Sequence, residues 1–160
     1  MYLKHLIIAN RDEEIRRIQF HPGMNLIVDD TKADTEMTGN NVGKTTVLRL
    51  IDYCLGADAK PIYTATDGSQ NLKVKTFLEE TEVYVEACFV STFVEDKGHK
   101  VVVRRNFLKR AKALNEINGK NYQASEYCEV LQMALWGVKT VTPQFSHIIS
   151  HSIRIDRSKH

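Results

Sequence analysis

The tripeptide Gly43-Lys44-Thr45 is the feature that most constrains the fold of this chain. A polar, Asn-rich turn precedes it, and apolar residues at helical spacing follow it over positions 47–55. Ahead of the turn, Pro22-Gly23 leads into a short apolar run at 24–28. We therefore expect a strand, a polar loop and a helix in succession, with Gly56 as the C-cap glycine of that helix.

This arrangement has the parts that a bound nucleoside triphosphate needs. These are backbone N–H groups converging on the phosphates, a helix N-terminus whose dipole favours anions, a lysine near the outer phosphates and a hydroxyl ligand for Mg²⁺. We expect Gly43 to let the backbone approach the phosphates, Lys44 to neutralise the β and γ groups, and Thr45 to coordinate Mg²⁺. Thr46 is expected to contact the α-phosphate. The predicted ATP site comprises Gly39, Asn40, Asn41, Val42, Gly43, Lys44, Thr45 and Thr46.

The loop departs from the usual P-loop pattern at its first glycine. The pattern G-x-x-x-x-G-K-[ST] places that glycine where this chain has Thr38, and Gly39 stands one position later. We therefore expect the entrance of the loop to be rearranged. A chance tripeptide that merely caps an ordinary helix is the alternative, but it would have to coincide with the strand before it and the apolar helix after it.

The remaining sequence predicts further strands and helices. Strands are expected over 3–9 and within 15–28, and three β-rich runs at 74–78, 83–90 and 101–108 are expected to form an antiparallel meander. Helical spacing returns over 125–135, with Ser125 as the predicted N-cap and Gly137 as the predicted C-cap, and a last helix is expected to begin near Pro143. The predicted fold class is α/β, a P-loop NTPase fold with an antiparallel β-meander.

Composition and charge exclude several classes of protein. The chain is 42% hydrophobic and 26% charged, which fits one globular domain over residues 1–160, and its net charge of +2 is too small for a nucleic-acid-coating protein. It has no signal-peptide pattern and no apolar window near the roughly 20 residues that span a bilayer. Its three scattered cysteines fit buried thiols in a reducing compartment, so we expect a cytoplasmic protein without a membrane partner.

Three segments together resemble the N-terminal lobe of SMC-type ABC ATPase heads, the group that includes chromosome-maintenance proteins, double-strand-break repair ATPases, RecF and RecN. Positions 18–27 read I-Q-F-H-P-G-M-N-L-I, like the strand "i-x-F-x-x-G-x-N-x-I" that precedes the P-loop in that family. Val102-Val103-Arg104-Arg105 is similar to its "v-x-R" strands, and positions 116–120 are similar to its "i-n-G-k" turn. The loop region looks most like an uncharacterised bacterial subgroup whose full-length members carry coiled coils.

The resemblance implies ATP and Mg²⁺ as ligands and a machine larger than this chain. In such heads ATP lies between two heads, and each site uses the partner's Ser-Gly-Gly-Gln-like signature loop and a strand that ends in Asp-Glu. Neither motif follows the P-loop here. We therefore expect a fragment that contains no catalytic residue of its own and is incomplete for hydrolysis. Its expected partners are a C-terminal lobe and a second head, in a protein of DNA maintenance, repair or defence.

Weaker signals add further candidate residues. By family position, Gln144 is a candidate contact to the nucleotide and to Mg²⁺, and Arg11 is a candidate nucleotide contact. The alternative is that Gln144 is an ordinary surface glutamine and Arg11 a solvated loop arginine. A basic stretch over 97–112 is a candidate contact to DNA phosphates, and a solvated strand edge is the alternative. Its candidate DNA contacts are Arg104, Arg105, Lys109 and Arg110.

Two other kinds of protein stay open. A self-contained P-loop kinase or GTPase would need an Asn/Thr-Lys-x-Asp motif or an arginine-rich lid, and we find neither in this sequence. A non-enzymatic interaction module would keep the P-loop only as structure, with Thr38 as a sign of a degraded site. Nucleotide affinity separates the second alternative from an ATPase lobe, because the interaction module predicts no binding.

Overall fold

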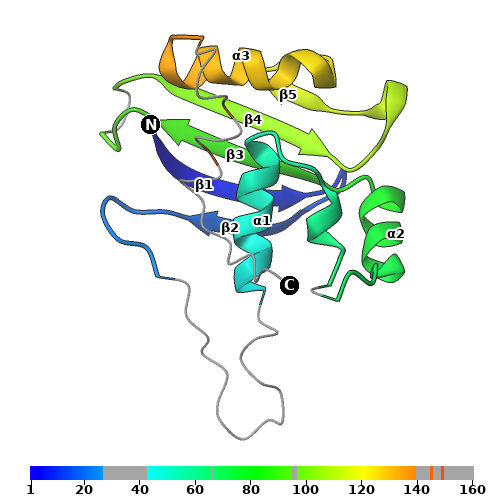
Figure 1. The fold of residues 1–160 in the computed structure, drawn as a ribbon. Helices are drawn as coiled ribbons and strands as arrows, with labels where there is room; N and C mark the ends of the chain where they lie inside the picture. Colours follow the sequence, from blue (N-terminus) through cyan, green and yellow to red (C-terminus); the bar gives the residue numbers. More distant parts are fainter. Residues whose placement is uncertain (27–42, 66, 95–96, 140–144, 146–148, 150–160) are drawn as a thin grey trace, which may run out of the picture.

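The computed structural model describes residues 1–26, 43–65, 67–94, 97–139, 145 and 149 (Figure 1). Within these ranges the chain forms three α-helices and six β-strands. In chain order they are β1 (Tyr2–Ala9), β2 (Glu14–Gln19), α1 (Lys44–Cys54), α2 (Leu72–Glu80), β3 (Tyr84–Val90), β4 (Lys100–Asn106), β5 (Asn115–Ile117), β6 (Lys120–Asn121) and α3 (Ala124–Trp136). Two short 3-10 helices, η2 (Lys60–Ile62) and η3 (Arg110–Lys112), lie in the connections.

The six strands form one antiparallel sheet in the order β2-β1-β3-β4-β5-β6. Its centre is set by Leu6 of β1 opposite Ala87 of β3, and by Ala87 opposite Val103 of β4. Because α1 and α2 lie between β2 and β3 in the chain, β1 and β3 pair across a long connection. The meander predicted from 83 onward is confirmed, and it continues through β5 and β6.

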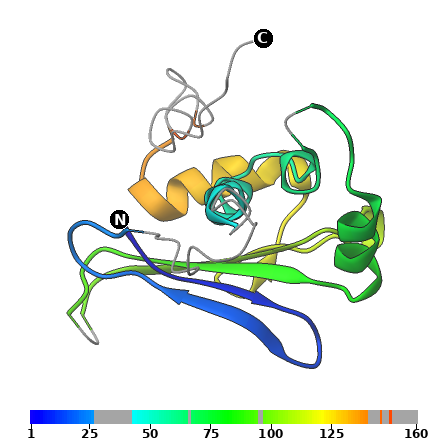
Figure 2. The same ribbon diagram turned by 90° about the horizontal axis from the view of Figure 1, so that it is seen from below.

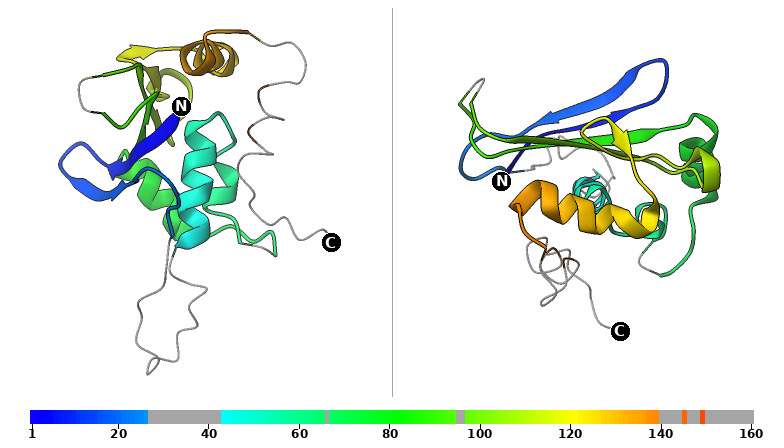
Figure 3. Two further views of the ribbon diagram at one scale, coloured as in Figure 1. Left: turned by 90° about the vertical axis from the view of Figure 1, so that its left-hand side faces the viewer. Right: turned by 90° about the horizontal axis from the view of Figure 1, so that it is seen from above.

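Helices α1 and α3 lie on the same face of the sheet, whereas the other face carries no helix among the described residues (Figures 2 and 3). The core fills the space between this helical layer and the sheet. Leu6, Val85 and Val103 from the sheet meet Leu50 of α1 and Leu131 of α3, and all five side chains are buried. Each buried aliphatic side chain contributes about 1.5–3 kcal/mol to folding, so this layer contact stabilises the position of α1.

Helix α1 begins and ends where the sequence predicts. Gly43 has φ 74° and precedes the first helical residue, and the N–H of Val47 donates to the carbonyl of Gly43 at 3.0 Å. At the other end Gly56 has φ 104°, a left-handed conformation that glycine adopts without a Cβ penalty, and its N–H donates to the carbonyl of Tyr53. The prediction of Gly56 as the C-cap glycine is confirmed.

The strand predicted at 74–78 is wrong, because these residues lie in helix α2. The side chain of Asn71 caps that helix by accepting a hydrogen bond from the N–H of Val74 at 3.1 Å. Leu78 is the buried residue of α2, whereas Phe77 is 49% exposed. β-branched residues in this segment suggested a strand, but the local N-cap and the burial of one helical position favour the helix.

Two smaller predictions about helix and turn signals have different outcomes. Ser125 is not the N-cap of α3, because Gln123 occupies that position and makes no side-chain capping bond. Gly137 is the predicted C-cap, with φ 70°. The predicted turn at Asn118-Gly119 joins β5 to β6, with both residues at positive φ as a tight hairpin turn requires.

The other predictions concern chain segments, thiols and membrane spans. Positions 24–26 of the run expected to feed the loop form no strand, and the helix expected near Pro143 lies outside the described residues except for helical Phe145 and Ile149. Cys54 and Cys88 are buried and Cys128 is partly buried, all as free thiols. In the described ranges, no helix is long and apolar enough to cross a membrane.

Candidate functional site

The described part of the predicted phosphate loop is the start of α1. Gly43 stands in the left-handed region immediately before the helix, and Thr45 and Thr46 are exposed in the first turn. That turn contains no acidic residue, so no carboxylate opposes an anion at the positive end of the helix dipole. The other predicted loop residues lie outside the described residues, namely Thr38, Gly39, Asn40, Asn41 and Val42.

These features fit the phosphates and Mg²⁺ that the sequence predicts. A left-handed glycine followed by the free N–H groups of a helix forms a concave anion site, and the Thr45 hydroxyl belongs to the class of oxygen ligands that Mg²⁺ takes. Among the described residues, no three His, Cys, Asp or Glu side chains gather as metal ligands. The metal assignment therefore depends on Thr45 and on Gln144, which lies outside the described residues, and it stays a prediction.

The opposite end of α1 is held by Arg105 of β4. Its Nη1 atom donates to the carbonyl of Tyr53 at 2.5 Å and to the carbonyl of Ala57 at 3.0 Å, while its Nε atom donates to Oδ1 of Asn115 at 3.0 Å. The guanidinium carbon lies 4.1 Å from the ring centre of Tyr53 and 5.0 Å from that of Tyr127. Arg105 thus ties α1 to β5 and α3.

Two tyrosines complete this polar cluster. The Tyr53 hydroxyl donates to the carbonyl of Asn106, its ring stacks on Phe107, and the Tyr127 hydroxyl donates to the carbonyl of Cys54 at 2.7 Å. Burial raises the pKa of Tyr53 and that of the Cys54 thiol to about 12, and it also raises the pKa of Tyr127. Because all three stay neutral at physiological pH, the cluster acts as structure and offers no ionised nucleophile.

Arg104 points to the helix-free face of the sheet and is also engaged within the chain. Its Nε atom lies 2.6 Å from Glu86, and Nη1 lies 3.6 Å from Glu116. The hydrogen bond to Glu86 raises the pKa of Arg104. Glu86 also lies 3.3 Å from Nε2 of His5, so these polar contacts run across β1, β3, β4 and β5.

The predicted DNA contacts therefore divide into two groups. Arg104 and Arg105 are engaged by carboxylates, carbonyls and an amide of the chain itself, and their role as DNA contacts stays a prediction. Lys109 and Arg110 are exposed in the connection between β4 and β5. Their role as DNA contacts stays a prediction.

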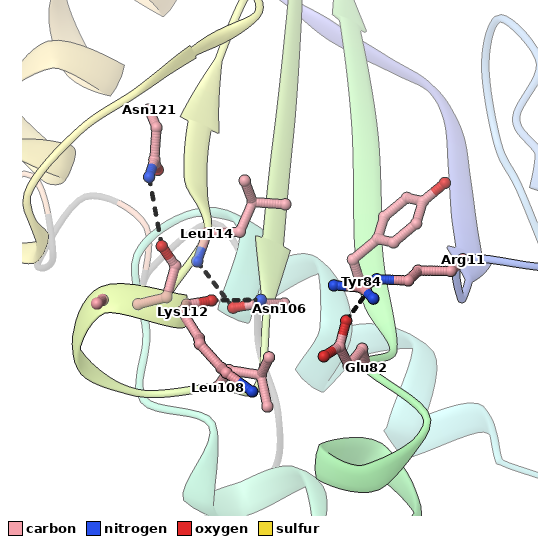
Figure 4. A pocket seen from close by; sticks show the side chains of 10 residues that line it. Arg11, Glu82, Tyr84, Asn106, Leu108, Lys112, Leu114 and Asn121 are labelled. Atoms are coloured by element: carbon pink, nitrogen blue, oxygen red, sulfur yellow. Dashed lines mark hydrogen bonds and ion pairs between the residues drawn. The ribbon is translucent and has the colours of Figure 1, made fainter.

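Arg11 lines a cavity of about 400 Å³ at the end of the sheet where β1 turns into β2 (Figure 4). Its Nε atom pairs with Glu82 at 2.6 Å. On the other side of the cavity the Asn106 side chain donates to the carbonyl of Lys112 and accepts from the N–H of Leu114. Gly43, Thr45 and Thr46 do not line this cavity, so the described residues do not join Arg11 to the helix start. Its nucleotide contact stays a prediction.

The sequence did not point to Arg105 as a contact of α1. The two adjacent arginines stand out only as part of a basic stretch, and alternation along a strand indicates that they face opposite sides without telling which side is buried. Arg105 lies opposite Asn115 on β5, and the hydrogen bond between the two side chains places Arg105 on the face of the sheet that carries the helices. This contact is known only from the tertiary structure. It makes Arg105, and not Arg104, a contact inside the molecule, between the sheet and the helices.

Comparisons with known proteins agree with this architecture. No protein-family model matches the chain. The chain is 29% identical over 108 residues, or 67% of its length, to the uncharacterised protein YydD of Bacillus subtilis (strain 168), and the match spans 16% of that relative. A solved structure from work on ATP-driven dimerization and DNA-stimulated activation of SMC ATPases matches with a TM-score of 0.52 and 19% identity.

The structural match covers 96% of this chain and 100% of the other. At this identity the likeness concerns the fold: a six-stranded antiparallel sheet with α-helices, similar to an SMC ATPase head. The predicted α/β fold and its likeness to such heads are confirmed at that level. The match to YydD covers a small part of a much longer protein, so the activity and partners of a whole protein of this kind are a matter for proposal.

Proposed function

We propose that this chain is the ATP- and Mg²⁺-binding N-terminal lobe, residues 1–160, of an SMC-like ABC ATPase head. The observation that carries the proposal is the fold likeness to an SMC ATPase over 96% of the chain, in a molecule whose Gly43-Lys44-Thr45 stands at the start of α1. A chance tripeptide would have no reason to coincide with both the helix start and this fold. The likeness by itself supports architecture, and the motif supplies the ligand.

In the proposed site each residue has a defined role. The loop from Gly39 to Val42 supplies backbone N–H groups, Gly43 keeps a side chain out of the way, and Lys44 neutralises the outer phosphates. Thr45 coordinates Mg²⁺, which spreads the charge that develops on the β and γ phosphates. Arg11 and Gln144 are additional proposed nucleotide contacts, and Gln144 is also a proposed contact to Mg²⁺.

The lobe alone is proposed to bind ATP without hydrolysing it. Its 160 residues contain neither a Ser-Gly-Gly-Gln-like loop nor an Asp-Glu pair after the P-loop, and a C-terminal lobe and a second head would supply them. The intact protein would carry coiled coils, work in the cytoplasm and couple head engagement to DNA maintenance, repair or defence. Lys109 and Arg110 are the proposed contacts to DNA phosphates, and that contact would weaken with added salt.

Calorimetric titration with Mg²⁺-ATP and Mg²⁺-GTP, together with a turnover assay, tests the proposal. We expect the chain to bind ATP and to show negligible turnover. Lys44→Ala should abolish ATP binding and leave the fold intact, as judged by circular dichroism, because it removes the charge that faces the phosphates. Lys73→Ala, on the exposed surface of α2, is the control and should bind ATP like the unmodified chain.

Other outcomes would favour the two remaining kinds of protein. Absence of ATP binding by the folded chain would indicate an interaction module that keeps the P-loop as structure. Turnover by the monomer would indicate a self-contained P-loop enzyme, with a preference for GTP pointing to a GTPase. Unchanged ATP affinity in Lys44→Ala would refute the assignment of the site.

A further inference from the structure

We infer that Arg105 is a positioning residue for the nucleotide site, which it serves by fixing helix α1 on the sheet from the end opposite the phosphate loop. The inference rests on the proposed function for the identity of the bound nucleotide. The link between Arg105 and α1 rests on the contacts described above. Among the described residues at the start of α1, Arg105 touches none of Gly43, Thr45 and Thr46. Its effect on a bound nucleotide is therefore exerted through α1.

The apolar contacts of α1 hold it against the sheet but do not fix it along its own axis. Leu50 and Cys54 are buried in the core, and α1 packs on β3 and β4. Hydrophobic contact is non-directional, so apolar packing constrains the helix along its own axis less strictly than hydrogen bonds do. Hydrogen bonds depend on distance and angle, and they supply the missing constraint.

Those directional contacts gather at the C-terminal end of α1. Arg105 donates to the carbonyls of Tyr53 and Ala57, and its guanidinium lies over the Tyr53 ring. The last turn of α1 contains no basic residue of its own. The negative end of the helix dipole favours a nearby positive charge, and Arg105 of β4 supplies it. The same guanidinium also contacts α3 through Tyr127.

A shift at this end reaches the phosphate loop because α1 is short and regular. Its 11 residues span about 16 Å at the rise of an α-helix. Gly43 joins the far end directly, with its carbonyl accepting the N–H of Val47. A displacement of the helix along its axis would carry Thr45 and the neighbouring N–H groups with it, and misplacement by about 1 Å weakens oriented contacts severely.

The neighbouring Arg104 provides a matched control on the same strand. It forms ion pairs with Glu86 and Glu116 on the opposite face of the sheet and does not contact α1. Its replacement removes the same charge and a comparable number of polar contacts. An effect of Arg105 that Arg104 lacks is therefore specific to the contact with α1.

The test compares Arg105→Met, Arg105→Lys and Arg104→Met in the full chain, with Mg²⁺-ATP affinity measured by calorimetry below the unfolding transition of every variant. Arg105→Met should weaken ATP binding about tenfold or more. Arg104→Met should stay within about twofold of the unmodified chain. Arg105→Lys keeps the charge but lacks the planar fork, so it should give an intermediate loss and also serves if the Met variant fails to fold.

Amide hydrogen exchange separates a positioning role from a local one. In Arg105→Met the exchange of residues 47–50 should accelerate, whereas a merely local role would affect only residues near 53–57. Wild-type affinity in the folded Arg105 variants, with exchange changed only near 53–57, would overturn the inference. If the unmodified chain binds no ATP, the proposed function fails. Unchanged exchange over residues 47–50 in Arg105→Met would then overturn the positioning role separately.

Discussion

Replacement of Tyr127 by phenylalanine tests whether the carbonyl at the end of α1 depends on a donor from α3. The Tyr127 hydroxyl donates to the carbonyl of Cys54 at 2.7 Å, and Tyr127 is 1% exposed. No other donor among the described residues bonds to that carbonyl. Phenylalanine keeps the ring and its packing, so the substitution removes the hydrogen bond and leaves a buried acceptor without a partner.

The expected cost follows from that unpaired acceptor. A buried group that loses its hydrogen bond costs about 1–3 kcal/mol, and exclusion of water from this position favours the upper half of the range. In a domain of this size about 1 kcal/mol lowers Tm by about 2–4 °C, so Tyr127→Phe should lower Tm by about 4–12 °C. The same loss should appear as a lower urea midpoint with an unchanged m-value.

Thermal and urea unfolding followed by circular dichroism measure this change. Tyr84→Phe is the control, because its ring lies near Arg104 but its hydroxyl makes no hydrogen bond among the described residues. It should change the free energy of unfolding by less than about 0.5 kcal/mol. Equal stability of Tyr127→Phe and Tyr84→Phe would refute the argument that α3 satisfies the end of α1.

Two further predictions concern the same region. Gly56→Ala should destabilise the chain more than Gly68→Ala. Both glycines have positive φ, but only the new Cβ at position 56 would lie 2.6 Å from the Cys128 sulfur. Equal losses in Tm for the two variants would contradict this prediction. Burial raises the pKa of Cys54 from 9.0 to about 12, so the stability it contributes is present below about pH 9 and is lost as pH rises toward 12. As pH rises from about 8 to about 11, the free energy of unfolding measured by urea titration should therefore fall less in Cys54→Ala than in the unmodified chain. An equal fall in both would contradict the raised pKa of Cys54.

Local signals were enough to predict much of the fold. Apolar periodicity and glycine C-caps predict α1 and the end of α3, and β-rich runs predict β1, β3 and β4. The strand predicted at 74–78 failed because the capping side chain of Asn71 and the burial of Leu78 outweigh β propensity there. Propensity is a weak signal where few side chains are buried, and α2 is such a segment.

The sequence by itself determined the chemistry of the candidate site, because Gly43-Lys44-Thr45 needs only neighbouring residues to form a helix start that suits phosphate. The tertiary structure alone decided which arginine contacts α1. Arg104 and Arg105 are identical in type and adjacent in the chain. Arg104 nevertheless pairs with carboxylates on the helix-free face of the sheet, whereas Arg105 holds α1. Their difference arises from strand alternation and from the packing of α1 on one face of β4, which no local pattern encodes.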